Sequence, residues 1–271
     1  MPAAAGADHL PPAPEPLPVE VADSHCHLDL MDGSVAAAVA SAQAVGVRRI
    51  VTIGIDVPSS RWAAAVADEH ADVYAGVAIH PNEAGAADEA GWADITRLAA
   101  LPKVRAVGET GLDYYRQSAP PERQRESFRR HIEIAKAAGV ALVIHDREAH
   151  ADVLAILAEE GPPERTVFHC FSGDAAMARV CADRGYVMSF AGNVTFRNAA
   201  GLREAAAVVP LELLLVETDA PFLAPTPFRG RPNAPYLVPL TVRALAAIRG
   251  DALDELAEAV AANSERVFGP W

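Results

Sequence analysis

Short apolar runs, rich in Val, Ile and Ala, recur along the whole chain, and longer segments with a helical spacing of apolar residues separate them. The runs are almost continuously apolar, as is typical of parallel strands that are buried on both faces. Eight runs of this kind occur, at residues 19–22, 48–53, 73–79, 104–107, 140–144, 166–168, 186–190 and 213–216. We therefore expect eight parallel strands.

The segments between the runs are Ala-rich and amphipathic, which predicts helices at residues 34–45, 59–69, 89–100, 123–138, 148–159, 174–183, 198–208, 239–248 and 251–262. Gly46, Gly139 and Gly185 follow three of these segments, where a helix favours glycine for a left-handed C-terminal cap. Strands that alternate with helices over about 250 residues predict a single-domain α/β fold, the (β/α)8 TIM barrel. An open, doubly wound sheet is the alternative, because periodicity does not show whether a sheet closes.

Histidines gather where the predicted strands end. His25 and His27 are separated by one residue, so on a strand their side chains point to the same face, as a pair that binds a divalent metal would. Five of the nine histidines lie at such ends: His25, His27, His80, His145 and His169. The other four lie in the N-terminal tail or in helices, and we assign them no function: His9, His70, His131 and His150. A barrel brings its strand ends together at one mouth, where active sites are found.

The composition is that of a globular protein, with 51% hydrophobic residues. No apolar stretch is long enough to span a membrane. Residues 1–18 are rich in Ala and Pro and lack a basic start and an apolar block, so they predict a disordered leader and not a secretory signal. Residues 19–271 then form the predicted domain. Three cysteines are a sparse and odd set, which favours a reducing compartment and a cytoplasmic location.

The net charge of −13 at pH 7 argues against tight, non-specific binding to duplex nucleic acid, because such binding relies on a basic surface. A basic rim around one cleft would still allow a nucleic-acid substrate. Neither a membrane nor an obligate protein partner is indicated by the sequence.

Six motifs at the predicted strand ends resemble those of one family. They are "DSHCHLD", "AIHP", "VGETGLDYY", "VIHDREA", "FHCFSG" and "VETDAPFL", and "NSERVFG" closes the series at residues 263–269. Together they resemble the TatD family of metal-dependent deoxyribonucleases, within the amidohydrolase-like barrels. The resemblance covers the whole chain except the leader, and six motifs in order are far more specific than any one of them.

The resemblance implies six metal ligands, and each position holds the residue type that the family needs: His25, His27, Glu109, His145, His169 and Asp219. Such a set suits Zn²⁺, Mn²⁺ or Mg²⁺, although Mg²⁺ is the poorest match for so many nitrogen ligands. We expect two divalent metal ions. One would bind to His25, His27 and Asp219. The other would bind to His145 and His169, with Glu109 as a bridge.

Asp219 and two further residues, Glu217 and His80, have expected roles in catalysis. Asp219 is the expected general base, because its carboxylate can contact a metal and the attacking water together; a simple ligand is the alternative. Glu217 lies two residues earlier on the same strand face and is expected to orient a ligand, or else to be a core carboxylate paired with an arginine. His80 is expected to contact a phosphate or to act as an acid for the leaving group. The alternative is a histidine hydrogen-bonded to Asn82 or Glu83.

Cys26 and Cys170 directly follow two of the implied ligands. Alternation along a strand directs both thiols outward, towards the helices. We therefore expect packing residues and not nucleophiles.

Arginines near the strand ends are candidates for holding an anionic substrate. Arg147 follows the fifth run, and Arg116 follows the "GLDYY" loop. Arg229 and Arg231 lie in "FRGRPN", in the long loop after the eighth run, where barrels often bind phosphate. Their guanidinium groups are suited to bidentate contacts with a phosphodiester.

Aromatic side chains near the same ends offer faces on which bases can stack. Tyr114 is the first candidate, together with Tyr115 and Phe222.

The sequence and the resemblance together predict a metal-dependent hydrolase of phosphodiester bonds. The resemblance alone implies a 3′-to-5′ exonuclease on single-stranded DNA or its 3′ ends, with RNA as another possible partner. A D-aminoacyl-tRNA deacylase, or another ester or amide hydrolase, is an alternative, because a related metal site suits carbonyl chemistry. A barrel that only binds a nucleotide or phosphate is the alternative from another class.

Overall fold

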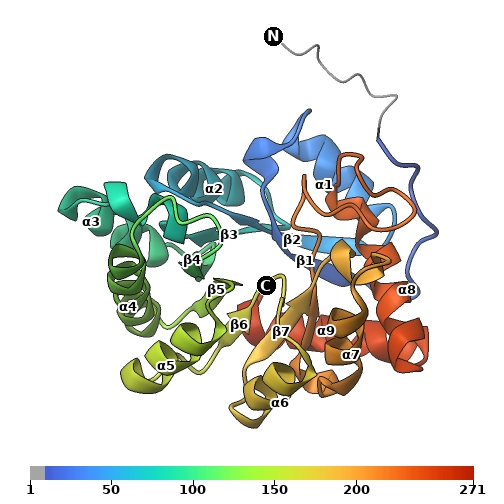
Figure 1. The fold of residues 1–271 in the computed structure, drawn as a ribbon. Helices are drawn as coiled ribbons and strands as arrows, with labels where there is room; N and C mark the ends of the chain where they lie inside the picture. Colours follow the sequence, from blue (N-terminus) through green and yellow to red (C-terminus); the bar gives the residue numbers. More distant parts are fainter. Residues whose placement is uncertain (1–9) are drawn as a thin grey trace.

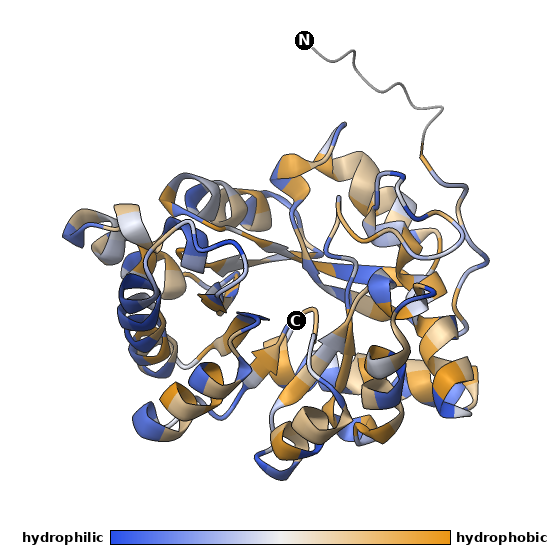
Figure 2. Ribbon diagram, viewed as in Figure 1, coloured by the Kyte–Doolittle hydropathy of each residue, from blue (hydrophilic) through white to orange (hydrophobic). Residues whose placement is uncertain are grey.

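A computed structural model of the chain describes residues 10–271. Eight parallel strands follow one another around a barrel in chain order, and the predicted (β/α)8 fold is confirmed (Figure 1). The strands are β1 (Val21–Cys26), β2 (Val47–Ile53), β3 (Val73–Val77), β4 (Val104–Asp113), β5 (Ala141–Arg147), β6 (Thr166–Phe168), β7 (Val187–Phe190) and β8 (Leu214–Val216). The strands are largely buried, and apolar residues occur both on the strands and on the helices (Figure 2), as expected for a sheet covered by helices.

Nine α-helices pack outside the strands in the described part of the chain: α1 (Val35–Gln43), α2 (Val57–Glu69), α3 (Glu89–Ala99), α4 (Pro121–Ala138), α5 (His150–Glu160), α6 (Ala175–Asp183), α7 (Ala200–Val208), α8 (Val238–Arg249) and α9 (Leu253–Phe268). Four of them begin where an N-cap side chain accepts a backbone N–H, at Ser34, Asp56, Asp88 and Asp174. α4 ends at Gly139 in the left-handed conformation, as predicted.

Three strands extend further than the sequence predicts. β1, β4 and β5 run on to Cys26, Asp113 and Arg147, so His25, Glu109 and His145 lie inside strands and not after them. Apolar runs mark only the part of a strand that is buried among apolar neighbours, whereas these strand ends are buried with polar residues at the mouth. These three candidates therefore lie on β-strands, although the pairing of β1 with β2 is irregular between Asp23 and Cys26, and that of β4 with β5 between Val107 and Thr110.

The barrel closes where β1 meets the chain after β8. The amide of Asp219 donates to the carbonyl of His25 at 2.9 Å, and the amide of His27 donates to the carbonyl of Ala220 at 2.7 Å. The buried Asp23 carboxylate accepts the Thr218 amide at 2.9 Å, and burial raises the pKa of this carboxyl to about 8. The seam thus brings the first and the last metal-ligand motifs together.

Apolar side chains fill the interior of the barrel beneath the carboxyl ends of its strands. Val51, Ile53, Val143 and Leu215 pack there with Phe268 from the end of α9, and Trp271 contacts the same cluster. The C-terminus accordingly lies at the centre of the ring in Figure 1. One end of the barrel is plugged, which leaves the carboxyl ends of the strands for a site.

Part of the predicted leader packs on the barrel. Leu17 is buried and its amide donates to the carbonyl of Val45, while the Tyr236 hydroxyl donates to the carbonyl of Pro11 at 2.6 Å. The expected disorder therefore does not extend to residues 10–18, because side chains of the barrel bind their backbone. The rest of the leader, and with it His9, lies outside the described residues. Within residues 10–271, no helix combines the length and apolar character needed to cross a membrane.

Candidate metal centre

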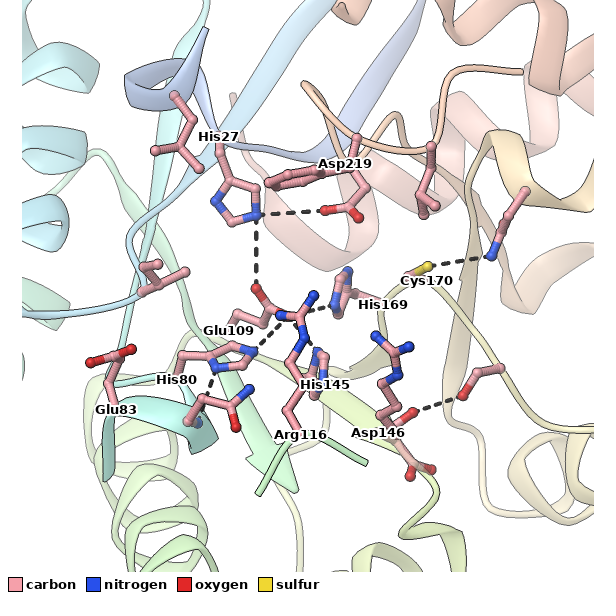
Figure 3. A pocket seen from close by; sticks show the side chains of 18 residues that line it. His27, His80, Glu83, Glu109, Arg116, His145, Asp146, His169, Cys170 and Asp219 are labelled. Carbon is pink, nitrogen blue, oxygen red and sulfur yellow. Dashed lines mark hydrogen bonds and ion pairs between the residues drawn. The ribbon is translucent and has the colours of Figure 1, made fainter. Parts of the chain in front are cut away.

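A pocket of about 540 Å³ opens at the carboxyl ends of the strands. Five of the six implied metal ligands line it: His27, Glu109, His145, His169 and Asp219 (Figure 3). The sixth, His25, is fully buried behind them. The structure thus brings all six residues to one place, although His25, Glu109 and His145 lie in β1, β4 and β5, and the other three lie after β1, β6 and β8.

One group of candidate ligands surrounds an oxygen atom of Glu109. Its Oε2 lies 3.7 Å from His25 Nε2 and 3.8 Å from His27 Nε2. Asp219 Oδ1 lies 3.9 Å and 3.5 Å from the same two nitrogens. Ligands that each lie about 2.0–2.2 Å from one ion are separated by roughly 3–4 Å, so these distances fit a shared cation.

A second group surrounds the other oxygen of the same carboxylate. Glu109 Oε1 lies 2.6 Å from His145 Nδ1, 2.9 Å from His169 Nε2 and 3.4 Å from His80 Nε2. Glu109 therefore stands between two sets of imidazoles and presents one oxygen to each (Figure 3).

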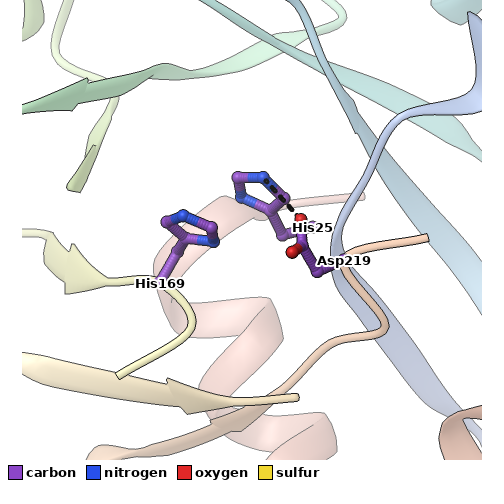
Figure 4. Close-up of side chains that lie close together, drawn as sticks. All are labelled: His25, His169 and Asp219. Atoms are coloured by element: carbon purple, nitrogen blue, oxygen red, sulfur yellow. Dashed lines mark ion pairs between the residues drawn. The ribbon is translucent and has the colours of Figure 1, made fainter. Parts of the chain in front are cut away.

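His25 supplies a direct test of whether the residues suit a metal. Both of its ring nitrogens are buried and have no hydrogen-bond partner. Its ring stacks on that of His169 at 3.8 Å between centroids and faces Asp219 (Figure 4). A buried polar atom without a partner is costly, and coordination of a cation by Nε2, which faces Glu109 and Asp219, would remove that cost for this nitrogen. The donor set therefore fits a divalent metal.

Hydrogen bonds behind the cluster fix the orientation of three rings. His27 Nδ1 lies 3.1 Å from the carbonyl of Ile53, so this nitrogen carries the proton and Nε2 is left with a free lone pair. His169 Nδ1 lies 3.1 Å from Glu217 Oε1, and His145 Nε2 lies 3.3 Å from Asp113 Oδ2. Carboxylate and carbonyl partners of this kind orient metal-binding histidines.

Asp113 is a residue of the site that the sequence reasoning missed. It lies four residues after Glu109, on the same strand and therefore on the same face. Besides His145, its carboxylate accepts hydrogen bonds from the Asn82 side chain and the Arg116 amide. Its position in "GLDYY" could have indicated it, because alternation directs it to the face that Glu109 occupies.

Glycine allows β4 to approach β5 closely beside these residues. Gly111 has a φ of +131°, and a Cβ atom at this position would lie 2.1 Å from the carbonyl oxygen of His145. Only glycine tolerates both the conformation and the approach. The close packing places Glu109 and Asp113 next to His145.

The two carboxylates of the cluster, Glu109 and Asp219, are ionised and therefore favour a cation between them. Burial acts to raise the pKa of Glu109, but the imidazoles of His169 and His80 outweigh it and hold the pKa well below its usual range. Burial likewise opposes ionisation of Asp219, yet the contact with His27 and the other nearby imidazoles lower its pKa. Both carboxylates are therefore ionised at neutral pH and available to a cation.

His80 joins the second group from the loop after β3. Its Nδ1 accepts the Asn82 amide at 3.1 Å, so the proton of the neutral ring lies on Nε2, which faces Glu109. Burial lowers the pKa of His80. The Asn82 contact that the sequence offered as an alternative is thus present, together with a position inside the pocket.

The predicted substrate residues do not all reach the pocket. Arg116 and Arg147 line it. Arg229 and Arg231 are not among the lining residues and lie further along the loop after β8. Tyr114 is also absent from the lining: its hydroxyl donates to Asp152 at 2.6 Å, and burial with this hydrogen bond raises its pKa to about 12.

The predicted outward direction of the two thiols is confirmed for Cys26 and wrong for Cys170. Cys26 is fully buried in the core. Cys170 lines the pocket, because the chain leaves β6 at Phe168 and Cys170 has a φ of +40°, so strand alternation no longer applies. The Asn193 side chain contacts its thiol at 3.6 Å.

Comparisons with known proteins agree with this site. The family model "TatD related DNase" matches residues 22–269. An uncharacterized metal-dependent hydrolase TatD of Mycobacterium tuberculosis is 46% identical over 256 residues, which cover 91% of this chain and 97% of that protein. A protein of Erwinia amylovora named 3′-5′ ssDNA/RNA exonuclease TatD is 34% identical over 235 residues, covering 84% and 91%.

A solved structure shares the fold closely. The crystal structure of YjjV, a TatD homolog from Escherichia coli, has a TM-score of 0.87 and 28% identity, and the match covers 92% of this chain and 97% of that one. The extent of the family match and the identity to these relatives establish the family. The chain belongs to the TatD family of metal-dependent hydrolases.

Proposed function

We propose that the pocket hydrolyses phosphodiester bonds at the 3′ ends of single-stranded DNA, and that RNA is a further substrate. The observation that carries this proposal is that five metal-ligand candidates line one pocket together with Arg116 and Arg147, with His25 buried directly behind them, in an acidic protein. Two cationic side chains at the mouth suit a substrate that is anionic at the reacting centre. The name of the Erwinia amylovora relative supports the same substrate class.

The cofactor of the proposed reaction is a pair of divalent ions, drawn from Zn²⁺, Mn²⁺ and Mg²⁺. His25, His27 and Asp219 would hold one ion, His145 and His169 the other, and Glu109 would contribute one oxygen to each. When bound, such a pair lowers the pKa of water and neutralises charge that develops on phosphoryl oxygens. The separate contacts of Glu109 Oε1 and Oε2 support this division.

Asp219 is the proposed general base. Its carboxylate is ionised and partly open to the pocket, with 16% of the side chain exposed. It can therefore accept the proton of the attacking water while the new P–O bond forms. Glu217 holds the ring of His169 from behind, at the distance of a hydrogen bond, and acts as a positioning residue.

His80 and the two arginines have complementary proposed roles. The Nε2–H of His80 is a hydrogen-bond donor and can bind a phosphoryl oxygen or the departing 3′ oxygen. Arg116 and Arg147 would hold the phosphate. The ring of Tyr115 lies 4.2 Å from the guanidinium carbon of Arg147 and orients this side chain, so less entropy is lost on binding.

A metal titration tests the cofactor proposal. Protein stripped of metal and loaded with Mn²⁺ or Zn²⁺ should bind about two ions per chain by elemental analysis. His145→Ala should bind about one and keep its circular dichroism spectrum. A wild-type protein that binds no metal after loading contradicts the proposal.

A paired substrate assay tests the reaction. The same metal-loaded enzyme receives a 5′-labelled single-stranded oligonucleotide and a D-aminoacyl-tRNA. A ladder that shortens from the 3′ end supports an exonuclease. Deacylation of the tRNA without a ladder would assign the site to hydrolysis of a carbonyl ester. Metal-dependent binding of the oligonucleotide without turnover of either substrate would indicate a protein that only binds nucleic acid.

A further inference from the structure

Basic and acidic residues are distributed very unevenly along the chain. Residues 184–203 and 220–250 contain seven arginines and no Asp or Glu. The remaining 220 residues carry 16 basic and 36 acidic side chains. Two stretches of positive charge therefore stand out in a protein whose net charge is −13.

Parts of these two stretches meet at the mouth of the barrel. The first stretch contains η4 (Gly192–Thr195), after β7, and the second begins with the loop after β8 and continues through α8. The amide of Thr226 donates to Thr195 Oγ1 at 2.8 Å, and its hydroxyl donates to the carbonyl of Thr195 at 3.1 Å. Arg229 then lies over the ring of Phe196, with 4.4 Å from the guanidinium carbon to the ring centroid.

The surface formed in this way is continuous with the pocket. Asn193, Phe222 and Leu223 line the pocket and belong to the same two loops. Phe196, Arg197, Phe228 and Arg229 lie a few residues further along these loops, and we call them the arginine–aromatic rim. Both arginines of the rim are exposed.

The positive charge of the rim is not neutralised locally. Within residues 10–271, neither Arg197 nor Arg229 forms an ion pair with a carboxylate, in contrast to Arg48, Arg97 and Arg249. The neighbouring Arg203 donates to backbone carbonyls of Val194 and Phe196 and so contributes a further positive charge to the loop. Cations of this kind favour a polyanion, and aromatic rings beside them favour nucleobases over a simple phosphate.

We propose that the rim binds the single-stranded tail of the substrate, several nucleotides on the 5′ side of the phosphate that reacts. This proposal rests on the proposed function. The pocket would bind the 3′ terminus, while the rim would hold backbone phosphates at Arg197 and Arg229. Affinity would then increase with strand length, although the reacting groups remain the same.

Kinetics with oligonucleotides of two to twelve nucleotides test the proposal. For the metal-loaded wild-type enzyme, kcat/KM should rise with length and reach a plateau. In Arg197→Ala/Arg229→Ala, the value for the dinucleotide should stay within about threefold of wild type, whereas the value for the twelve-nucleotide strand should fall about tenfold through KM. The slope of log KM against log salt should lose about 0.7 per phosphate contact removed.

A matched double variant controls for the change in net charge. Arg48 and Arg97 are also exposed, but they lie at the start of β2 and in the last turn of α3, at the opposite end of the barrel. Arg48→Ala/Arg97→Ala should retain the wild-type dependence on length. The proposal would be contradicted if kcat/KM fell equally in both double variants. It would also be contradicted if kcat/KM of Arg197→Ala/Arg229→Ala fell equally for short and long strands.

A binding measurement separates failure of the rim from failure of the proposed function. Fluorescence anisotropy with a labelled twelve-nucleotide strand in the presence of EDTA requires no turnover. Weaker binding by Arg197→Ala/Arg229→Ala supports the rim even if the enzyme cleaves no strand. Unchanged binding, with normal cleavage by the wild type, would reject the rim and leave the proposed function intact.

Discussion

The two ends of the barrel use the same scaffold for opposite purposes. At the carboxyl ends of the strands, four imidazoles and two carboxylates lie within a few ångströms, and both nitrogens of His25 lack a hydrogen-bond partner. At the amino ends, Phe268 and Trp271 fill the barrel, and Tyr74 packs on Trp271 at 4.7 Å between ring centroids. The carboxyl end of the barrel contains buried polar groups without hydrogen-bond partners, and the amino end contains buried apolar side chains.

This difference indicates which end of the barrel stabilises the fold and which end lowers its stability in favour of function. Ionisable groups without water destabilise a fold unless they are paired, and sites for catalysis accept that cost. The plug at the other end supplies apolar burial that is independent of any ligand. Changes at the plug should therefore affect stability, and changes at the mouth should affect activity.

The largest effect is expected at the plug. Phe268→Ala should lower the free energy of unfolding by about 3–5 kcal/mol, because the ring is fully buried and its removal leaves a cavity. Urea denaturation followed by circular dichroism measures this. Phe222→Ala is the matched control at the mouth, where the ring is 51% exposed, and should change stability by less than about 0.5 kcal/mol. An equal decrease in the free energy of unfolding in the two variants would contradict the proposed difference between the two ends.

A loss of activity without a loss of stability is expected at the mouth. Asp219→Asn keeps the shape of the side chain but cannot accept a proton, so turnover should fall by more than about 10²-fold. Initial rates at full metal occupancy measure it. Asp72→Asn makes the same chemical change on the loop before β3, at the plugged end, and should leave turnover unchanged. Wild-type turnover in Asp219→Asn would remove this carboxylate from the mechanism.

His131 provides a further test of this division between the two ends. It binds the backbone of Ile79 near the mouth, yet its substitution should change the free energy of unfolding and not the activity. Its Nε2 accepts the amide of Ile79 at 3.0 Å, and its Nδ1–H donates to the carbonyl of Ser127 at 2.8 Å. Burial lowers its pKa from 6.5 to about 4. When the pH falls from 7 to 5, His131 gains a proton in the unfolded chain but not in the folded chain. The free energy of unfolding should therefore decrease by about 2 kcal/mol.

The measurement for His131 compares urea denaturation at the two pH values. His131→Gln should be less stable than wild type at pH 7, but its stability should fall less on going to pH 5, because the titrating group is gone. The same fall in both proteins would show that His131 does not cause it.

The smallest effects are expected from two arginines that both lie over aromatic rings. The guanidinium carbon of Arg49 lies 5.3 Å from the centroid of the Trp271 ring at the plug, and that of Arg147 lies 4.2 Å from Tyr115 at the mouth. Arg49→Ala should lower the free energy of unfolding by about 0.5–1 kcal/mol without changing kinetics. Arg147→Ala should raise KM for an oligonucleotide and leave unfolding nearly unchanged. The reverse pattern would contradict the division between the two ends.

The sequence by itself determined the alternation of eight strands with helices and the polar residues at the ends of the apolar runs, whereas the set of six metal ligands followed from the resemblance of its motifs to the TatD family. Apolar runs have a local cause, since a strand buried on both faces needs them, and so eight strands could be predicted. Histidines such as His25, His145 and His169 were recognisable because they closely follow apolar runs, at a position where a barrel gathers its functional residues. Their convergence then followed from the barrel, in which all strand ends meet.

The tertiary structure alone decided which loop residues reach the pocket. Tyr114 and Tyr115 are neighbours in the chain, yet one binds Asp152 on α5 and the other packs on Arg147. Arg229 and Phe196 are far apart in sequence and in contact in space. The direction of a loop side chain depends on contacts between distant segments, which no periodicity encodes, whereas the direction of a strand side chain follows from the alternation of the backbone.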